Sequence, residues 1–168
     1  MVLPACMAFD FDSTLAYFRE GKEGLSAIFT QRGISEDIVL QAYKEAKRDG
    51  GFNIKKFQLH VENLTQHGFD SIEIEREFKS WLRENLILYP ESLTTLSRWR
   101  ILHVPVAIIT FGDPKYQRQK IATFHLPYNE LHIVTAKDGK PRELRKLLRK
   151  YGKHIVFVDD KPSVLDGV

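Results

Sequence analysis

The feature that most constrains the fold is a short apolar run near the start of the chain that ends in two carboxylates. The run Ala5–Phe9 is followed by the segment Asp10–Thr14, with the sequence DFDST. A short apolar run bounded by polar residues is typical of a parallel strand buried on both faces. Side chains two positions apart in an extended chain point to the same side, so Asp10 and Asp12 are predicted to flank one point at the sheet edge. Their mutual repulsion there favours a bound cation, although the same segment taken alone is also compatible with a plain turn.

Later apolar runs in the chain repeat this arrangement. Val104–Ile109 ends in a threonine and a glycine, Leu131–Val134 is a shorter strand candidate, and His154–Val158 ends in two aspartates. Amphipathic segments near 114–124 and 142–150 separate these runs, and their apolar residues recur with helical spacing. Strands that alternate with helices predict an α/β fold with a parallel sheet.

The segment from residue 17 to residue 88 has a different character. It contains four stretches with helical periodicity, and Ser35, Asn53 and either Asp70 or Ser71 stand where helix N-caps are expected. Glycines follow several of these stretches, as they do at helix ends. The sequence therefore predicts an all-helical insert, of which most residues serve packing alone.

Composition excludes several classes of function. The 168 residues carry 25 Lys and Arg against 22 Asp and Glu, and the resulting charge of +3 does not indicate an anionic partner. The cations of the segment 142–150 are not interleaved with aromatic residues, so we expect no nucleic-acid partner. Cys6, the single cysteine, lies in an apolar run too short to span a membrane. We therefore expect a protein of the cytoplasm without membrane contact.

The polar groups at the strand ends and helix starts are of complementary kinds. Carboxylates from two strands form an oxygen-rich site that suits Mg²⁺, which takes its remaining ligands from water and substrate phosphate. A hydroxyl, backbone N–H groups and an ammonium group can bind the phosphoryl oxygens. The predicted metal ligands are Asp10, Asp12, Asp159 and Asp160, and the predicted phosphate-binding residues are Thr110, Phe111, Gly112 and Lys140.

These motifs together resemble the four signature motifs of the haloacid dehalogenase superfamily. They are D-x-D-x-T after the first strand, a strand ending in Thr110, the Lys140-Pro141 pair before a helix, and a strand ending in Asp159-Asp160. The resemblance covers nearly the whole chain. It implies a Rossmann-like three-layer α/β sandwich formed by residues 1–16 and 89–168, with residues 17–88 inserted as a helical cap of the type placed between the first two motifs.

The resemblance also implies a role for each matching position. Asp10 would be the nucleophile that forms an aspartyl-phosphate, and Asp12 would protonate the leaving oxygen and then activate water. Thr110 and Lys140 would bind the phosphoryl group, and the Asp159-Asp160 pair would hold Mg²⁺ together with Asp10 and the Asp12 backbone carbonyl. The dehalogenase branch of the family lacks a carboxylate at the second position, so Asp12 favours phosphate chemistry.

The sequence leaves several alternatives open. Lys137 competes with Lys140 for the cationic role, and we prefer Lys140 because Pro141 is expected at the first position of its helix. Ser13 stands where many relatives have glycine, which requires its φ to stay negative. The chain stops at Val168, before the fifth strand expected of the family. Either the chain is a minimal or truncated version of the fold, or a partner completes the edge of the sheet.

The sequence also leaves more than one function open for the protein. The expected activity is Mg²⁺-dependent hydrolysis of a small phosphorylated metabolite. A phosphomutase would share every core residue and differ in how its cap excludes water. A catalytically inactive phosphate-binding or phosphoprotein-binding module would not need the proton carrier Asp12. The sequence identifies neither the metabolite nor the oligomeric state.

Overall fold

The apolar run that opens the chain forms a central strand of a parallel sheet in the computed structural model. β1 (Cys6–Phe9) pairs with β4 (Val106–Phe111) on one side and with β6 (Ile155–Val158) on the other, and β4 pairs with β5 (Glu130–Val134). The strand order is β5-β4-β1-β6. The structure describes residues 3–48, 51–136 and 138–162.

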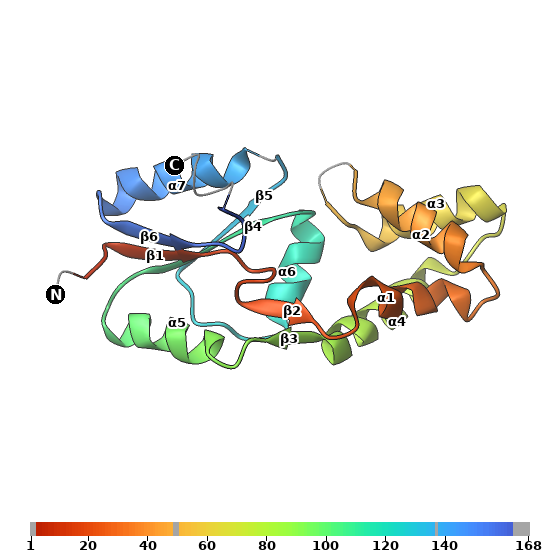
Figure 1. Ribbon diagram of the computed structural model, residues 1–168, viewed down its shortest axis with the longest axis horizontal. Helices are drawn as coiled ribbons and strands as arrows, with labels where there is room; N and C mark the ends of the chain where they lie inside the picture. The colour runs from red at the N-terminus through yellow and green to blue at the C-terminus, as the bar shows by residue number, and fades with distance from the viewer. Residues whose placement is uncertain (1–2, 49–50, 137, 163–168) are drawn as a thin grey trace. The chain divides into compact units, whose positions relative to one another are not determined.

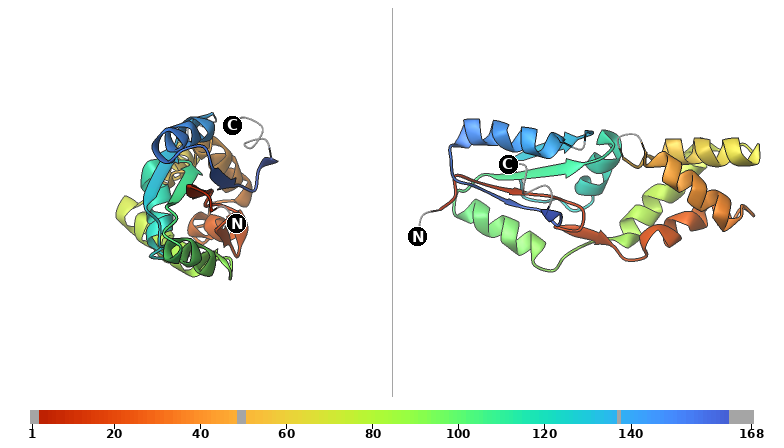
Figure 2. Two further views of the ribbon diagram at one scale, coloured as in Figure 1. Left: turned by 90° about the vertical axis from the view of Figure 1, so that its left-hand side faces the viewer. Right: turned by 45° about the horizontal axis from the view of Figure 1, so that its top comes forward.

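Helices cover both faces of this sheet. α5 (Ser92–Ile101) and α7 (Gly139–Tyr151) lie on opposite faces (Figures 1 and 2), and α6 (Pro114–Ala122) connects β4 to β5. On the α7 face, small and branched side chains of the central strands pack against the leucines of the helix. This core consists of Cys6, Ala8, Ala107, Ile109, Leu144 and Leu147. The predicted α/β fold with a parallel sheet between helical layers is confirmed.

The order of the strands identifies the edge at which a ligand can bind. The chain runs from β1 outward to β4 and β5 and then returns to β6 on the other side of β1. In open α/β sheets the crevice at such a reversal lies beyond the carboxyl ends of the two strands that flank it. Here those strands are β1 and β6, which are followed by Asp10 and Asp159.

The chain forms two compact units, one made of Met1–Tyr17 with Ile87–Val168 and the other of Phe18–Leu86. The second unit contains α1 (Gly21–Thr30), α2 (Glu36–Ala46), α3 (Ile54–Thr65) and α4 (Ser71–Asn85). Asn53 and Asp70 cap α3 and α4 through their side chains. None of the helices in the described part of the chain is long and apolar enough to cross a bilayer.

The helical unit has a core of its own, made largely of aromatic side chains. Phe29 contacts Phe57 and Phe69 edge-on, with ring centroids 5.0 and 5.3 Å apart. Arg32 forms a two-pronged ion pair with Glu77 at 2.9 and 2.7 Å, which joins α4 to the end of α1. These contacts all lie within the unit.

The pairing of two short strands was not predicted from the sequence. β2 (Ala16–Phe18) and β3 (Leu86–Leu88) form a two-stranded sheet that contains both points at which the chain passes between the units. Strands of three residues are too short for their alternation to be recognised in a sequence.

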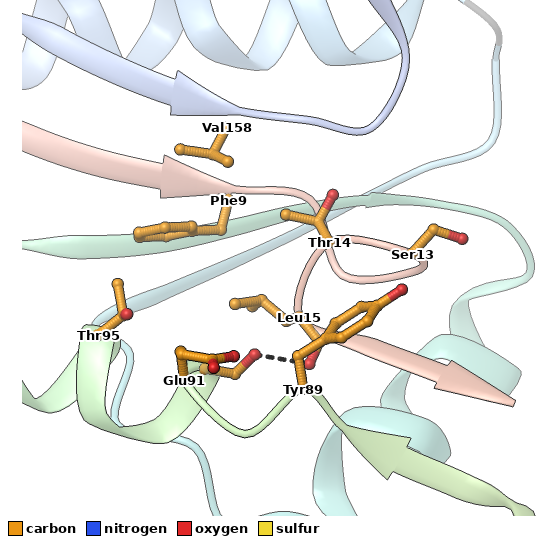
Figure 3. Close-up of a pocket in the computed structure, with 9 residues that line it drawn as sticks. Phe9, Ser13, Thr14, Leu15, Tyr89, Glu91, Thr95 and Val158 are labelled. Atoms are coloured by element: carbon orange, nitrogen blue, oxygen red, sulfur yellow. Dashed lines mark hydrogen bonds between the residues drawn. The ribbon is translucent and has the colours of Figure 1, made fainter. Parts of the chain in front are cut away.

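A pocket of about 360 Å³ lies on the α5 side of the sheet (Figure 3). Phe9 and Val158 form its wall on the strand side, and the Ser92 hydroxyl beside it donates a hydrogen bond to the Leu15 carbonyl. Because side chains alternate along a strand, Asp10 points to the opposite side of β1 from Phe9. The pocket is therefore separate from the carboxylates at the sheet edge.

Candidate active site

Asp10 is held at the end of β1 by contacts to both neighbouring elements. Its backbone N–H donates to the Val158 carbonyl at 2.8 Å, which continues the pairing of β1 with β6 by one residue. Its carboxylate faces the same side as Ala8 and meets the ammonium group of Lys140, with 2.9 Å between Oδ1 and Nζ. Only 3% of the residue is exposed. Asp10 is thus a buried carboxylate with a cationic partner at the predicted sheet edge.

Lys140 reaches this carboxylate from the first turn of α7. The helix begins at Gly139, so the prediction that Pro141 occupies the first helical position is wrong. A Cβ atom at Gly139 would lie 2.5 Å from the Cβ of Val134, and only glycine lets this turn lie so close to β5. The turn directs Lys140 to the sheet edge, where its ammonium group also lies 2.6 Å from Asp159 Oδ2. Lys137, the alternative cation, lies outside the described residues.

Asp159 and Asp160 follow β6 and complete a cluster of carboxylates. One carboxylate oxygen from each of Asp10, Asp159 and Asp160 lies within 4.8 Å of the others. Asp159 also accepts a hydrogen bond from the Lys161 backbone N–H at 2.8 Å, which fixes its orientation. An all-oxygen set of this size fits a hard divalent cation such as Mg²⁺ better than a metal that prefers nitrogen or sulfur ligands. The side chain of Asp12 is not part of this cluster.

Thr110 lies near the end of β4 and is completely buried. Its hydroxyl has no hydrogen-bond partner among the described residues, which is unfavourable for a buried polar group unless a ligand supplies the partner. The Gly112 N–H, another expected phosphate donor, already donates to the Val134 carbonyl at 2.9 Å. The hydroxyl of Thr110 and the ammonium group of Lys140 are two donors suited to an anionic ligand.

Asp12 makes contacts that the sequence did not predict. Its carboxylate forms a short ion pair with Lys120 and accepts a hydrogen bond from the Gln117 side-chain amide at 3.0 Å. Both partners belong to α6 and both are buried. Burial lowers the pKa of Lys120, and the Asp12 carboxylate opposes this shift. Helical periodicity would place a lysine of α6 on the solvent side, so the sequence pattern did not indicate this ion pair.

Ser13 turns the chain immediately after Asp12 and has a φ of 63°. The expectation that this φ stays negative is therefore wrong. The left-handed conformation costs a non-glycine residue about 1–2 kcal/mol, and the Ser13 N–H offsets part of that cost by donating to the Ala16 carbonyl at 2.8 Å. The tight turn is thus kept without the glycine that would relieve its strain.

Burial dominates the electrostatics of Asp10. Removal from water raises the pKa of its carboxyl group to about 6, even though the nearby Lys140 ammonium acts in the opposite direction. The folded chain therefore holds a proton on Asp10 at a pH at which an exposed aspartate would already be ionised. A metal cation bound to the cluster would favour the ionised carboxylate that nucleophilic attack requires.

We expect Asp10→Asn to stabilise the metal-free protein at pH 8. Because the pKa of Asp10 rises from 3.8 to about 6 on folding, the free energy of unfolding falls as the pH rises through this interval. The full penalty is at most about 3 kcal/mol, and an amide does not incur it. Urea unfolding of both proteins in chelator at pH 4 and pH 8 measures the difference, which should be present only at pH 8. A variant less stable than the wild type at pH 8 would contradict this prediction.

Comparison with known proteins agrees with this arrangement. The family model of the haloacid dehalogenase-like hydrolases matches residues 4–165, so the chain belongs to this family of hydrolases. No curated protein sequence matches the chain. Solved structures match its fold throughout.

Three of these structures illustrate the range of the fold. A protein assigned as a beta-phosphoglucomutase from Thermotoga maritima has a TM-score of 0.67 and 14% identity, over 96% of this chain and 79% of that one. A predicted phosphoglycolate phosphatase from Haemophilus somnus has a TM-score of 0.55 and 17% identity, over 95% and 78%. An L-2-haloacid dehalogenase from Xanthobacter autotrophicus, with chloropropionic acid covalently bound, has a TM-score of 0.59 and 16% identity, over 98% and 73%. These identities support the shared fold but do not distinguish among the three activities.

Proposed function

We propose that the protein is a Mg²⁺-dependent phosphatase that hydrolyses a small phosphomonoester through an aspartyl-phosphate. The observation that carries this proposal is the meeting of Asp10, Lys140 and Asp159 at the sheet edge, and the unpartnered hydroxyl of Thr110 near the end of the neighbouring strand β4 supports it. A buried nucleophile, a cation, a carboxylate metal site and a free donor are the groups that phosphoryl transfer needs. When bound, Mg²⁺ would be held by Asp10, Asp159 and Asp160 and would neutralise charge on the phosphoryl oxygens.

The residues of the chain account for both halves of the reaction. In the first, an oxygen of Asp10 forms a bond to phosphorus while the ester P–O bond breaks, and Asp12 gives its proton to the leaving oxygen. In the second, Asp12 removes a proton from water as the water attacks the aspartyl-phosphate, which releases inorganic phosphate and restores Asp10. Lys140 and Thr110 bind the phosphoryl oxygens throughout, so the group stays in line for each attack.

Asp12 favours this reaction over dehalogenation. A halide leaves as a stable anion and needs no proton, whereas the alkoxide of a phosphomonoester is a poor leaving group. A carboxylate two residues after the nucleophile is therefore useful for ester hydrolysis and unnecessary for halide release. The phosphomutase alternative uses the same groups and differs in returning the phosphoryl group to a sugar hydroxyl.

The test is hydrolysis of p-nitrophenyl phosphate with and without divalent metal. We expect turnover with Mg²⁺, little turnover with Ca²⁺, and none in excess chelator. Ca²⁺ is larger and takes six to eight oxygen ligands in a looser geometry, which disturbs in-line attack. A parallel assay with 2-chloropropionate should release no chloride. Undiminished hydrolysis in chelator would overturn the metal requirement, and phosphate transfer to a sugar phosphate without release of inorganic phosphate would favour the mutase.

A further inference from the structure

We infer that Lys120 and Gln117 of α6 are positioning residues, which hold the carboxylate of Asp12 in the orientation that proton transfer requires. This inference rests on the proposed function, in which Asp12 is the proton carrier. It concerns residues outside the four motifs and assigns α6 a part in the reaction. Neither residue is placed in contact with the substrate.

The first support is that both oxygens of the Asp12 carboxylate are engaged. Lys120 Nζ contacts Oδ1 in a short ion pair, and Gln117 Nε2 donates to Oδ2 at 3.0 Å. A carboxylate bound at one oxygen can still rotate about its Cβ–Cγ bond. Bonds to both oxygens fix the plane of the group, and a charge-assisted bond fixes it more strongly than a neutral one.

The second support is the cost of placing a lysine here. Lys120 is only 2% exposed, and its ammonium group lies 5.5 Å from the Phe11 ring centroid and 4.9 Å from that of Tyr116. A methionine or leucine would fill this position without removing a charge from water, so packing of α6 does not explain the ammonium group. The ion pair with Asp12 does explain it, because it directs a buried cation at one specific carboxylate.

The third support is that Gln117 is itself fixed to the backbone. Its side-chain amide also donates to the Phe111 carbonyl at 2.8 Å. A Cβ atom at Gly112 would lie 2.7 Å from that same amide nitrogen, and the φ of 144° at Gly112 also favours glycine. Gln117 therefore links Asp12 to the strand end that carries Thr110, so the proton carrier and the phosphate-binding hydroxyl share one support.

This arrangement matters only for the proton-transfer part of the reaction. The side chain of Asp12 is 38% exposed, so without its partners it would sample several rotamers in water. A proton carrier must lie within hydrogen-bond reach of the leaving oxygen, and orientation contributes much of its effect. An aryl oxide leaves without a proton, so attack on an aryl phosphate is far less sensitive to Asp12. Disordering Asp12 should therefore lower kcat/KM selectively for alkyl phosphates, because kcat/KM reports the steps up to release of the leaving group and excludes the water attack that both substrates share.

The experiment compares Lys120→Met and Gln117→Met with the wild type in Mg²⁺, using p-nitrophenyl phosphate and a simple alkyl phosphate. We expect Lys120→Met to lower kcat/KM for the alkyl substrate about ten- to a hundredfold, part of what a general acid provides, and kcat/KM for the aryl substrate less than about threefold. Gln117→Met should show the same selectivity with a smaller amplitude. The Mg²⁺ affinity measured by calorimetry should stay unchanged.

Arg118→Met is the matched control, because Arg118 is an exposed cation on the same helix. We expect this substitution to change the rate for neither substrate.

The Lys120→Met variant should still fold, since water can solvate the remaining, partly exposed Asp12 carboxylate. The Gln117→Met variant loses only a neutral donor. An equal loss of kcat/KM for both substrates would mean that the two residues are merely structural, and an unchanged or increased kcat/KM for the alkyl substrate would likewise overturn the inference. With either of these results, phosphate ester hydrolysis by the wild type would still support the proposed function. A wild type that hydrolyses neither phosphate would overturn both.

Discussion

Asp10→Asn should abolish phosphate ester hydrolysis, with kcat falling by at least about 10⁴-fold. The amide oxygen is uncharged and cannot form the acyl-phosphate bond, and the substitution also removes one of the three carboxylates of the metal cluster. Acid quenching of the wild type during turnover, followed by mass spectrometry, should find phosphate on the peptide that contains Asp10. The same treatment of Asp10→Asn should find none.

A carboxylate at the other edge of the sheet provides the control for this substitution. Glu130 begins β5, so it lies at the amino ends of the parallel strands. Glu130→Gln removes a charge of the same sign and should leave kcat within about twofold, because an interaction at that edge is not part of the reaction. Phosphate trapped on a residue other than Asp10 in the wild type would contradict the assignment of the nucleophile.

Lys140→Met should destabilise the protein by about 3–5 kcal/mol at pH 8 and remove its activity. The substitution leaves the carboxylates of Asp10 and Asp159 buried and facing each other without the ammonium group that lies 2.9 and 2.6 Å from them. The loss should shrink near pH 5, where Asp10 is protonated. Added Mg²⁺ should restore part of the stability, because a cation at the cluster replaces the missing charge.

Lys146→Met on the same helix separates this effect from the loss of any lysine. Lys146 is half exposed and pairs with Glu143 on the surface, so its removal should change the free energy of unfolding by less than about 1 kcal/mol. Denaturant titrations of both variants with and without Mg²⁺ provide the comparison. Equal stability of Lys140→Met and the wild type at pH 8 would show that the buried carboxylates are solvated some other way.

Much of the sheet and its polar edge could be predicted because parallel strands impose simple geometry. Buried strands appear as apolar runs, their carboxyl ends meet at one edge, and residues such as Asp10 and Asp159 must then be neighbours. The position of Lys140 followed from the expected start of its helix, although that helix begins earlier than Pro141. These inferences required only strand direction and the order of the motifs.

Features that depend on side-chain placement could not be predicted in the same way. Helical periodicity assigns polar residues to the solvent face, so a buried ion pair such as that of Lys120 with Asp12 contradicts the rule on which the prediction rests. The positive φ of Ser13 likewise opposes the usual preference for glycine. Both exceptions lie next to the candidate active site, where local rules of sequence and structure are most often broken.

The pairing of β1 has a consequence for the order in which the two units acquire structure during synthesis. Cys6 pairs with Ile155, and Met7 pairs with both Val106 and Val156, so the ribosome makes β1 long before its sheet partners. The helical unit instead draws its packing from segments close together in sequence, which form contacts quickly. We expect the insert to fold on the nascent chain while β1 is still unpaired. The apolar run of β1 therefore stays in contact with solvent for a long part of translation, when it can aggregate or bind a chaperone.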